Sequence, residues 1–176
     1  GASRSLEAVA SLSRISPEID LSTNEGTDWL HLVVNAYAST ENQRQLLLIF
    51  QQYPEALDSN EQAALMIAEA MMGEEKMPEY NLVRGQWRGR EKQQARWVFL
   101  DVQEKILEGK REEAAFLLKA NRFTGKNETD RLVRLAALHV VDDPDMSWKY
   151  LSEASSIDPA NPDIHTFMAS LGEALN

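Results

Sequence analysis

The sequence predicts an all-α protein built as a right-handed superhelical stack of antiparallel helix pairs. Two observations carry this prediction: apolar and small side chains recur with a period of 34 residues, and no segment shows the two-residue alternation of a β-strand. Stacked pairs of short helices produce such a period because one pair cannot bury its apolar face alone. The recurring positions form three sets separated by multiples of 34: Trp29, Leu32, Val33 and Ala36; Ala63, Met66, Ile67 and Ala70; His165, Met168, Ala169 and Gly172.

Composition is typical of one soluble helical domain, with 43% hydrophobic and 26% charged residues among 176. We expect residues 1–26 to form a lead-in segment with a weak helix at Ser5 to Ile15, and residues 27–176 to form the repeat domain. No apolar run is long enough to span a bilayer. The chain begins with Gly-Ala-Ser rather than Met, which indicates a processed or excised fragment of a longer or exported protein. Cytoplasm and periplasm both stay open as locations.

Polar caps, prolines and glycines predict two helix pairs in the first half of the repeat domain. Side chains at the N-cap accept the free backbone N–H groups of a helix start, and proline or a left-handed glycine ends a helix. The expected helices are 28–38, capped by Thr27 or Asp28; 40–53, capped by Ser39 or Thr40 and stopped by Pro54; 60–72, capped by Ser59 and ended by Gly73; and 78–87.

The same reasoning predicts two further pairs and a terminal helix. The expected helices are 90–108; 111–122, after Gly109; 128–141, capped by residues 127–129; 147–157, after a proline-containing turn at 142–145; and a last helix that opens at Pro162. Helices that open a pair therefore start 31 to 37 residues apart, near residues 28, 60, 91, 128 and 162.

Residues 97–176 contain a recognisable spacing of small, bulky and proline residues. Ser147, Leu151, Ala154 and Pro159 have the small, bulky, small, proline order that closes a helical repeat. His165, Met168, Ala169 and Gly172 occupy the next opening helix, and a second fragment has Gly109 in a turn with Ala114 and Leu118 in the helix that follows. With these positions the segment resembles the tetratricopeptide repeat (TPR) family, with degenerate units. The resemblance implies a right-handed α-solenoid and a non-enzymatic interaction module or scaffold, whose groove is lined by the first helix of each pair.

The resemblance also suggests what the groove would bind. The family's carboxylate clamp uses Lys, Asn and Arg on consecutive opening helices, whereas the corresponding positions here are Leu132, Val133, Ala136 and Phe167. We therefore expect a protein or peptide partner, held in a hydrophobic groove or in one suited to an acidic peptide. The terminal helix is apolar on one side and can pack inward; if that side were exposed, it would support self-association through terminal helices.

A cationic middle segment offers a candidate binding site in an acidic protein of net charge −10. Residues 84–134 carry 13 basic and 8 acidic side chains, and their densest part contains Arg84, Trp87, Arg88, Arg90, Lys92 and Arg96. Guanidinium groups bind carboxylates or phosphates, and an indole can stack on a ligand. The other reading is a solvated helix surface with core tryptophans. A nucleic-acid-associated adaptor using residues 84–96 is the alternative function.

The two readings differ in the positions of two tryptophans. We expect Trp97 to be buried, since it is in phase with Trp29, and Trp87 to be more exposed, since it stands between Gly85 and Gly89. If both are buried, the binding site is expected on the concave faces of the helices that begin near residues 60, 91 and 128.

No pattern predicts catalysis, a cofactor or a metal. The chain has no Cys and only His31, His139 and His165, which form no motif for nucleophilic catalysis or zinc binding, and the last two are expected in packing roles. Asp142, Asp143 and Asp145 lack the remaining ligands of a calcium loop, which favours turn and capping roles. We therefore expect no enzyme.

Overall fold

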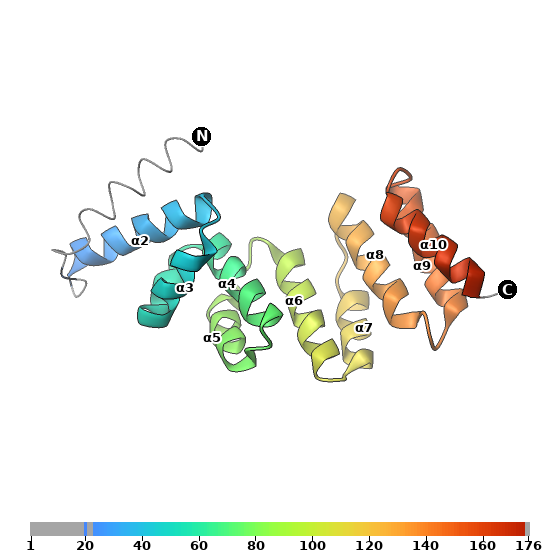
Figure 1. Ribbon diagram of the computed structural model, residues 1–176, viewed down its shortest axis with the longest axis horizontal. Coiled ribbons are helices and arrows are strands. Elements are labelled where there is room, and N and C mark those ends of the chain that lie inside the picture. The colour runs from blue at the N-terminus through green and yellow to red at the C-terminus, as the bar shows by residue number, and fades with distance from the viewer. Residues whose placement is uncertain (1–19, 21–22, 175–176) are drawn as a thin grey trace. The chain divides into compact units, whose positions relative to one another are not determined.

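Every regular element of the described chain is a helix, which confirms the all-α prediction (Figure 1). The computed structural model describes residues 20 and 23–174, so the expected helix at Ser5 to Ile15 lies outside the described residues. Two compact units are present: the first ends at Trp97 and the second begins at Val98, within helix α6. None of the described helices is long and apolar enough to cross a membrane.

The first unit is organised around a buried central helix. Its elements are α2 (Asn24–Ser39), α3 (Gln43–Gln52), the 3₁₀ helix η2 (Pro54–Ser59), α4 (Glu61–Gly73), α5 (Met77–Trp87) and the first turn of α6 (Gln94–Leu107). Helix α4 contacts α2, α3, η2 and α5. A helix surrounded in this way must be apolar on most of its circumference. Its buried residues accordingly include Ala63, Ala64, Leu65, Met66, Ile67, Ala68, Met71 and Met72.

The first two expected caps are wrong because other side chains reach the free N–H groups. Thr23 caps α2 by accepting from the Gly26 N–H at 3.1 Å, so the helix begins several residues earlier than expected. Ser39 and Thr40 instead donate their hydroxyls to the Ala36 carbonyl, both at 2.9 Å, at the end of α2. Helix α3 consequently starts later, capped by Asn42.

Two boundaries of α4 also differ from the prediction. Asn60, rather than Ser59, caps the helix by accepting from the Ala63 N–H at 2.8 Å, because Ser59 belongs to the unpredicted η2. The left-handed residue after the helix is Glu75, with φ 55°, and not Gly73. Gly109, by contrast, has φ 74° at the end of α6, as its position predicted.

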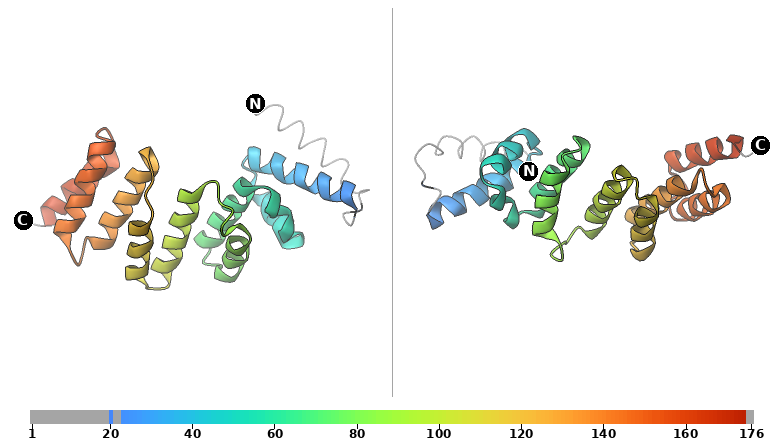
Figure 2. Two further views of the ribbon diagram at one scale, coloured as in Figure 1. Left: turned by 180° about the vertical axis from the view of Figure 1, so that it is seen from behind. Right: turned by 90° about the horizontal axis from the view of Figure 1, so that it is seen from below.

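The second unit contains antiparallel neighbouring helices (Figures 1 and 2). They share two apolar clusters. Its helices are the rest of α6, α7 (Arg111–Ala120), α8 (Gly125–His139), α9 (Pro144–Ile157) and α10 (Pro162–Ala174). One cluster joins α6, α7 and α8 through Val98, Val102, Ala114, Leu118 and Leu135. The other joins α8, α9 and α10 through Leu132, Ala136, Leu151, Ala154, Ile164 and Leu171.

Helix starts in the second unit shift for the same local reasons as in the first. Helix α8 begins at Gly125, before the expected cap at residues 127–129, and α9 begins at Pro144 because Asp143 accepts from the Met146 N–H at 3.0 Å. The expected capping role of this acidic turn is thus confirmed for Asp143. Helix α6 starts only at Gln94, because residues 88–93 form a turn in which Gly89 has φ 81°.

Most, but not all, of the repeat positions that the sequence places in the core are buried. At the repeat positions, Met66 is buried and Met168 is half-buried, whereas Leu32 is 57% exposed. Leu100, 34 residues after Met66, and Leu135, one residue out of this register, are also buried. In α2 the buried face instead contains Leu30, Val33, Val34 and Ala38. The prediction is therefore wrong at Leu32, whose helix is rotated relative to the repeat pattern.

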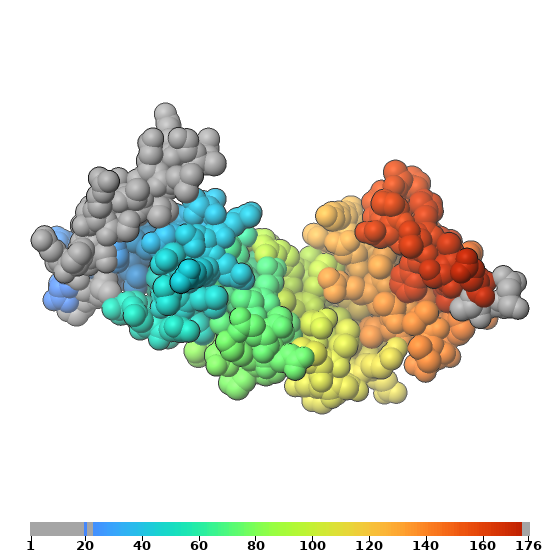
Figure 3. Space-filling model, viewed as in Figure 1, coloured from blue at the N-terminus to red at the C-terminus, as the bar shows by residue number. Residues whose placement is uncertain are grey.

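The terminal helix packs inward on its neighbour. Ile164 and Leu171 are buried in the cluster with α9, and Phe167 and Met168 pack against it. In the space-filling view α10, in red, lies over α9, in orange (Figure 3). His165 is exposed rather than packed, and its Nε2 lies 2.8 Å from the Pro159 carbonyl oxygen. The apolar side of this helix is thus used within the second unit.

Candidate functional site

The cationic segment does not present its arginines on one common surface. Arg84 is buried, donates to Glu91 Oε1 at 2.7 Å and lies with its guanidinium 5.2 Å from the centroid of Trp97. Burial opposes ionisation of Glu91, but hydrogen bonds from Arg84 and the backbone more than offset it, so the pKa of Glu91 lies below its ordinary value. Arg84 is therefore part of the internal packing of the first unit.

Trp87 is buried, which contradicts its expected role as an exposed indole. Only 5% of its surface is accessible, and Arg90 lies over its ring with the guanidinium carbon 4.9 Å from the centroid. Arg90 also donates to the Gln86 and Asp58 carbonyls at 3.2 and 2.9 Å. Trp97 is fully buried, as expected.

The remaining cations of the segment differ in their surroundings. Arg96 donates to Glu69 Oε1 at 2.6 Å and to Gln62 Oε1 at 2.9 Å. Arg88 and Lys92 are exposed, and within the described chain their side chains form no hydrogen bond or ion pair. Arg84, Arg90 and Arg96 thus each bind different acceptors, which favours the reading of a helix surface over that of a shared anion site. The binding role of the segment remains an untested prediction.

Glu61 explains why this segment is ordered around Trp97. The Oε1 atom of this carboxylate accepts from the Lys92 N–H at 2.8 Å, the Gln93 N–H at 3.0 Å and the Trp97 indole at 3.1 Å. The free N–H groups at a helix start need acceptors. Here a carboxylate in the first turn of α4 supplies one for α6.

The second unit contains a cleft of about 590 Å³ formed by α8, the α9–α10 turn and the start of α10. Because both tryptophans are buried, the site is expected on the helices that begin near residues 60, 91 and 128. The cleft lies on the last of these. Its lining residues are Lys126, Asp130, Val133, Arg134, Asp158, Ala160, Asn161, Pro162 and Asp163. The volume is within the range of sites that bind small ligands or short segments.

Arg134 is the most distinctive side chain of this cleft. Its guanidinium carbon lies 4.6 Å from the centroid of Phe99, and Phe99 in turn contacts the edge of Phe123 at 5.7 Å between centroids. The neighbouring protein atoms displace part of its hydration water, which lowers the pKa of the guanidinium, and Asp130 partly offsets this effect. Among the residues that the structure describes, none accepts a hydrogen bond from Arg134.

The opposite wall of the cleft is acidic. Asp158 Oδ2 accepts from Asn161 Nδ2 at 3.1 Å, and Asn161 Oδ1 accepts from the Asp163 N–H at 3.1 Å. These two hydrogen bonds fix the turn that holds both carboxylates. Arg134 and Lys126 on α8 therefore share the cleft with Asp158 and Asp163 near the start of α10.

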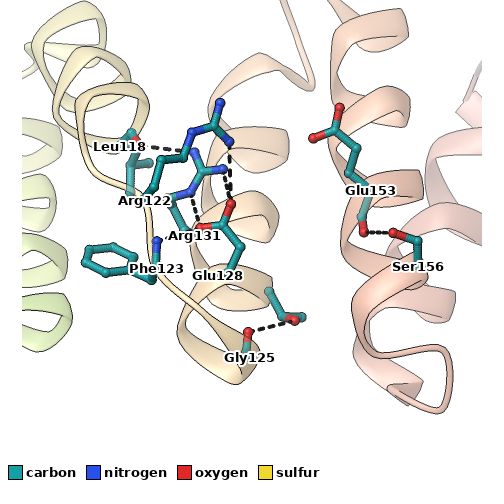
Figure 4. A network of polar contacts seen from close by, with 9 residues as sticks. Leu118, Arg122, Phe123, Gly125, Glu128, Arg131, Glu153 and Ser156 are labelled. Atoms are coloured by element: carbon teal, nitrogen blue, oxygen red, sulfur yellow. Dashed lines mark hydrogen bonds and ion pairs between the residues drawn. The ribbon is translucent and has the colours of Figure 1, made fainter.

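Arg131, one turn away from Arg134, shows what a fully paired arginine looks like on the same helix. It is buried and donates to both carboxylate oxygens of Glu128 and to the Leu118 carbonyl, the latter at 3.1 Å (Figure 4). Glu128 also accepts from the Phe123 N–H at 3.0 Å. The Arg131 hydrogen bond outweighs burial, and the pKa of Glu128 falls to about 2. This pair ties the α7–α8 connection to α8 and keeps the Arg131 guanidinium inside the protein.

A second depression, of about 400 Å³, lies between α7 and α8. It is lined by apolar side chains that include Phe116, which is 70% exposed, and Leu138. Arg111, at its edge, donates to the Leu138 carbonyl at 2.8 Å. Arg111 is thus already engaged within the protein, in contrast to Arg134 of the first cleft.

Sequence reasoning missed the α8 cleft, although one signal was present. Lys126, Asp130 and Arg134 are spaced four residues apart, which places three charged side chains on one face of a helix. Helix surfaces are commonly charged at this spacing, so the pattern alone does not mark a site. Within the described residues no group of His, Asp or Glu side chains is arranged to hold a metal ion.

Comparisons with known proteins add no relative: no family model, curated protein or solved structure matches this chain.

Proposed function

We propose that the protein is a TPR-like right-handed solenoid that acts as a non-enzymatic interaction module and binds a peptide or partner helix. The family spacing supports the fold: Ser147, Leu151 and Ala154 are fully buried at the small and bulky positions that close a repeat. Ala114 and Leu118 are buried at the equivalent positions of the preceding unit. Repeats of this kind bind through surfaces shared by neighbouring helices.

The binding surface in this proposal is the cleft between α8 and α10. The observation that carries it is the contrast between two arginines of α8: Arg131 is buried and saturated by acceptors of the protein, whereas Arg134 is exposed and has no acceptor in the described chain. A guanidinium with free N–H groups binds a carboxylate through two hydrogen bonds. A partner that fills the cleft can supply that acceptor.

Charge reversal combined with affinity capture tests this function. The immobilised full chain and its variant Arg134→Glu are exposed to lysate of the source organism, and retained proteins are compared by mass spectrometry. We expect the wild type to retain a specific protein that Arg134→Glu loses. Arg44→Glu is the matched control, because Arg44 is exposed on α3 and its side chain forms no hydrogen bond or ion pair in the described chain.

A third variant separates the two candidate surfaces. Arg88 and Lys92 are the cations of residues 84–96 that are left without partners, so Arg88→Glu with Lys92→Glu removes the charge still available there. Retention by this variant is expected to equal that of the wild type. Loss of the partner here but not in Arg134→Glu, or nuclease-sensitive retention, would favour the nucleic-acid-associated adaptor and reject the cleft.

A further inference from the structure

We propose that the α8–α10 cleft selects a short peptide segment of mixed charge, with an acidic side chain on Arg134 and a basic side chain facing Asp158 and Asp163. This inference rests on the proposed function and deepens it by giving the chemistry of the partner. It follows from the opposite charges of the two walls rather than from the size of the cleft.

Arg134 selects the acidic side chain of the peptide. The guanidinium carbon of Arg134 lies over the Phe99 ring, 4.6 Å from its centroid, and no described residue accepts a hydrogen bond from its N–H groups. A planar fork of donors fits a carboxylate, which can accept two parallel hydrogen bonds. Lys126 adds positive charge to the same helix.

Asp158 and Asp163 select the basic side chain of the peptide. Asn161 uses its amide to hold both residues, leaving the Asp163 carboxylate without a hydrogen bond or ion pair in the described chain. No Lys or Arg follows Lys149 in the sequence, so neither α10 nor the turn before it offers a counter-ion. A basic side chain of a partner would complement this wall.

The arrangement disfavours ligands of a single charge. A purely acidic segment would meet Asp158 and Asp163, together with Asp130 from α8, and a purely basic one would meet Arg134 and Lys126. Like charges brought together at an interface oppose binding and thereby confer specificity. Asp130 also lies four residues from both cations, which weakens the attraction of α8 for a simple anion such as phosphate.

Four blocked hexapeptides provide matched probes for this preference. They are acetyl-Ser-Glu-Ala-Ala-Lys-Ser-amide, the same peptide with Glu and Lys exchanged, and versions with two Glu or two Lys. Each is titrated into the ¹⁵N-labelled full chain while the Arg134 Nε–H and the backbone N–H signals of α8 and α10 are followed. We expect at least one mixed peptide to bind several-fold more tightly than either single-charge peptide, with shifts at both Arg134 and Asp163.

Charge reversal sharpens the test. In Arg134→Glu the preference should move to the two-Lys peptide, because all the acidic groups of the cleft then face the ligand together. Arg122→Glu is the control, since Arg122 is 72% exposed and does not line the cleft, and it should keep the wild-type order. Circular dichroism confirms that both variants remain folded.

Each outcome decides the proposal. Equal or tighter binding of a single-charge peptide, binding of none of the four, or an unchanged preference in Arg134→Glu would overturn the mixed-charge rule. Such a result leaves the proposed function intact if Arg134→Glu still loses the captured protein. If the mixed-charge preference is absent and Arg134→Glu also retains the captured protein, the cleft is rejected as a binding site.

Discussion

Glu128 and Arg131 form a bidentate ion pair at the start of α8, with Arg131 Nε donating to Oε2 at 2.7 Å and Nη2 donating to Oε1 at 2.6 Å. The arginine is buried and its third contact is the carbonyl of Leu118 on α7. The pair therefore joins the end of one helix to the start of the next. It also sets the position of α8, which carries Arg134 into the cleft.

Removing one partner of this pair should destabilise the protein strongly. Glu128→Gln leaves the buried guanidinium without a counter-charge, and breaking a buried pair in this way costs about 3 to 5 kcal/mol. Urea denaturation followed by circular dichroism measures the effect. The control is Arg122→Ala: Arg122 contacts the same carboxylate at 3.4 Å but is exposed, so its removal should cost about 0 to 1 kcal/mol. Similar losses in both variants would show that Arg131 does not depend on Glu128.

The same pair predicts a pH dependence. The pKa of Glu128 is lowered from 4.5 to about 2 in the folded protein, so its contribution to stability is complete above pH 4.5 and is lost as the pH falls toward 2. The difference in unfolding free energy between the wild type and Glu128→Gln should therefore shrink over this window. Denaturation curves measured at a series of pH values follow the difference directly. A difference that stays constant down to the lowest pH at which both proteins fold contradicts the assignment.

Replacing Glu61 should lower the stability of the protein more than is usual for a residue in the first turn of a helix. Glu61→Ala removes the acceptor of two backbone N–H groups and of the Trp97 indole. Unsatisfied buried donors cost about 1 to 3 kcal/mol each, and Glu61→Gln, which keeps an oxygen, should lose less. Tryptophan fluorescence and denaturation report the change. The comparison variant is Glu69→Ala, which removes an exposed partner of Arg96 and is expected to cost about 0 to 1 kcal/mol.

Two leucines at corresponding repeat positions, offset from the 34-residue period by one residue, should respond differently to truncation. Leu135 is fully buried in the cluster of α6, α7 and α8, so Leu135→Ala should cost about 2 to 5 kcal/mol. Leu32 is 57% exposed, and Leu32→Ala should change stability by no more than about 0.5 kcal/mol. Thermal and urea denaturation measure both. A large loss of stability in Leu32→Ala would show that Leu32 is buried, as the repeat pattern predicted.

The helices themselves could be predicted because their period and their proline and glycine boundaries are local properties of the sequence. Their starts were less predictable, since several polar residues can cap each one. Thr23 caps α2 in place of Thr27, and Asn60 caps α4 in place of Ser59. The rotation of α2 that exposes Leu32 depends on packing against its neighbours. Such choices are decided by contacts that the pattern does not contain.

The site was harder to predict than the fold. Residues 84–96 have the composition of an anion site, but Glu91 within the segment and Asp58 and Glu69 from earlier in the chain supply internal acceptors. Arg131 and Arg134 each follow an acidic residue of the same helix, Glu128 and Asp130, but only Arg131 binds its carboxylate. Arg131 also reaches the Leu118 carbonyl of α7, whereas Arg134 lies over Phe99. The difference between a structural and a binding arginine is therefore tertiary.

Site-specific photo-crosslinking tests most directly whether a protein segment occupies the α8–α10 cleft. Benzoylphenylalanine replaces Val133, which lines the cleft, or Leu82, which is 50% exposed on α5, as the control. After irradiation in lysate, cross-linked products are resolved by mass spectrometry. The account predicts a discrete protein adduct at position 133 that is absent at position 82 and abolished by Arg134→Glu. Adducts of equal yield at both positions, or an adduct at position 133 that survives Arg134→Glu, would contradict it.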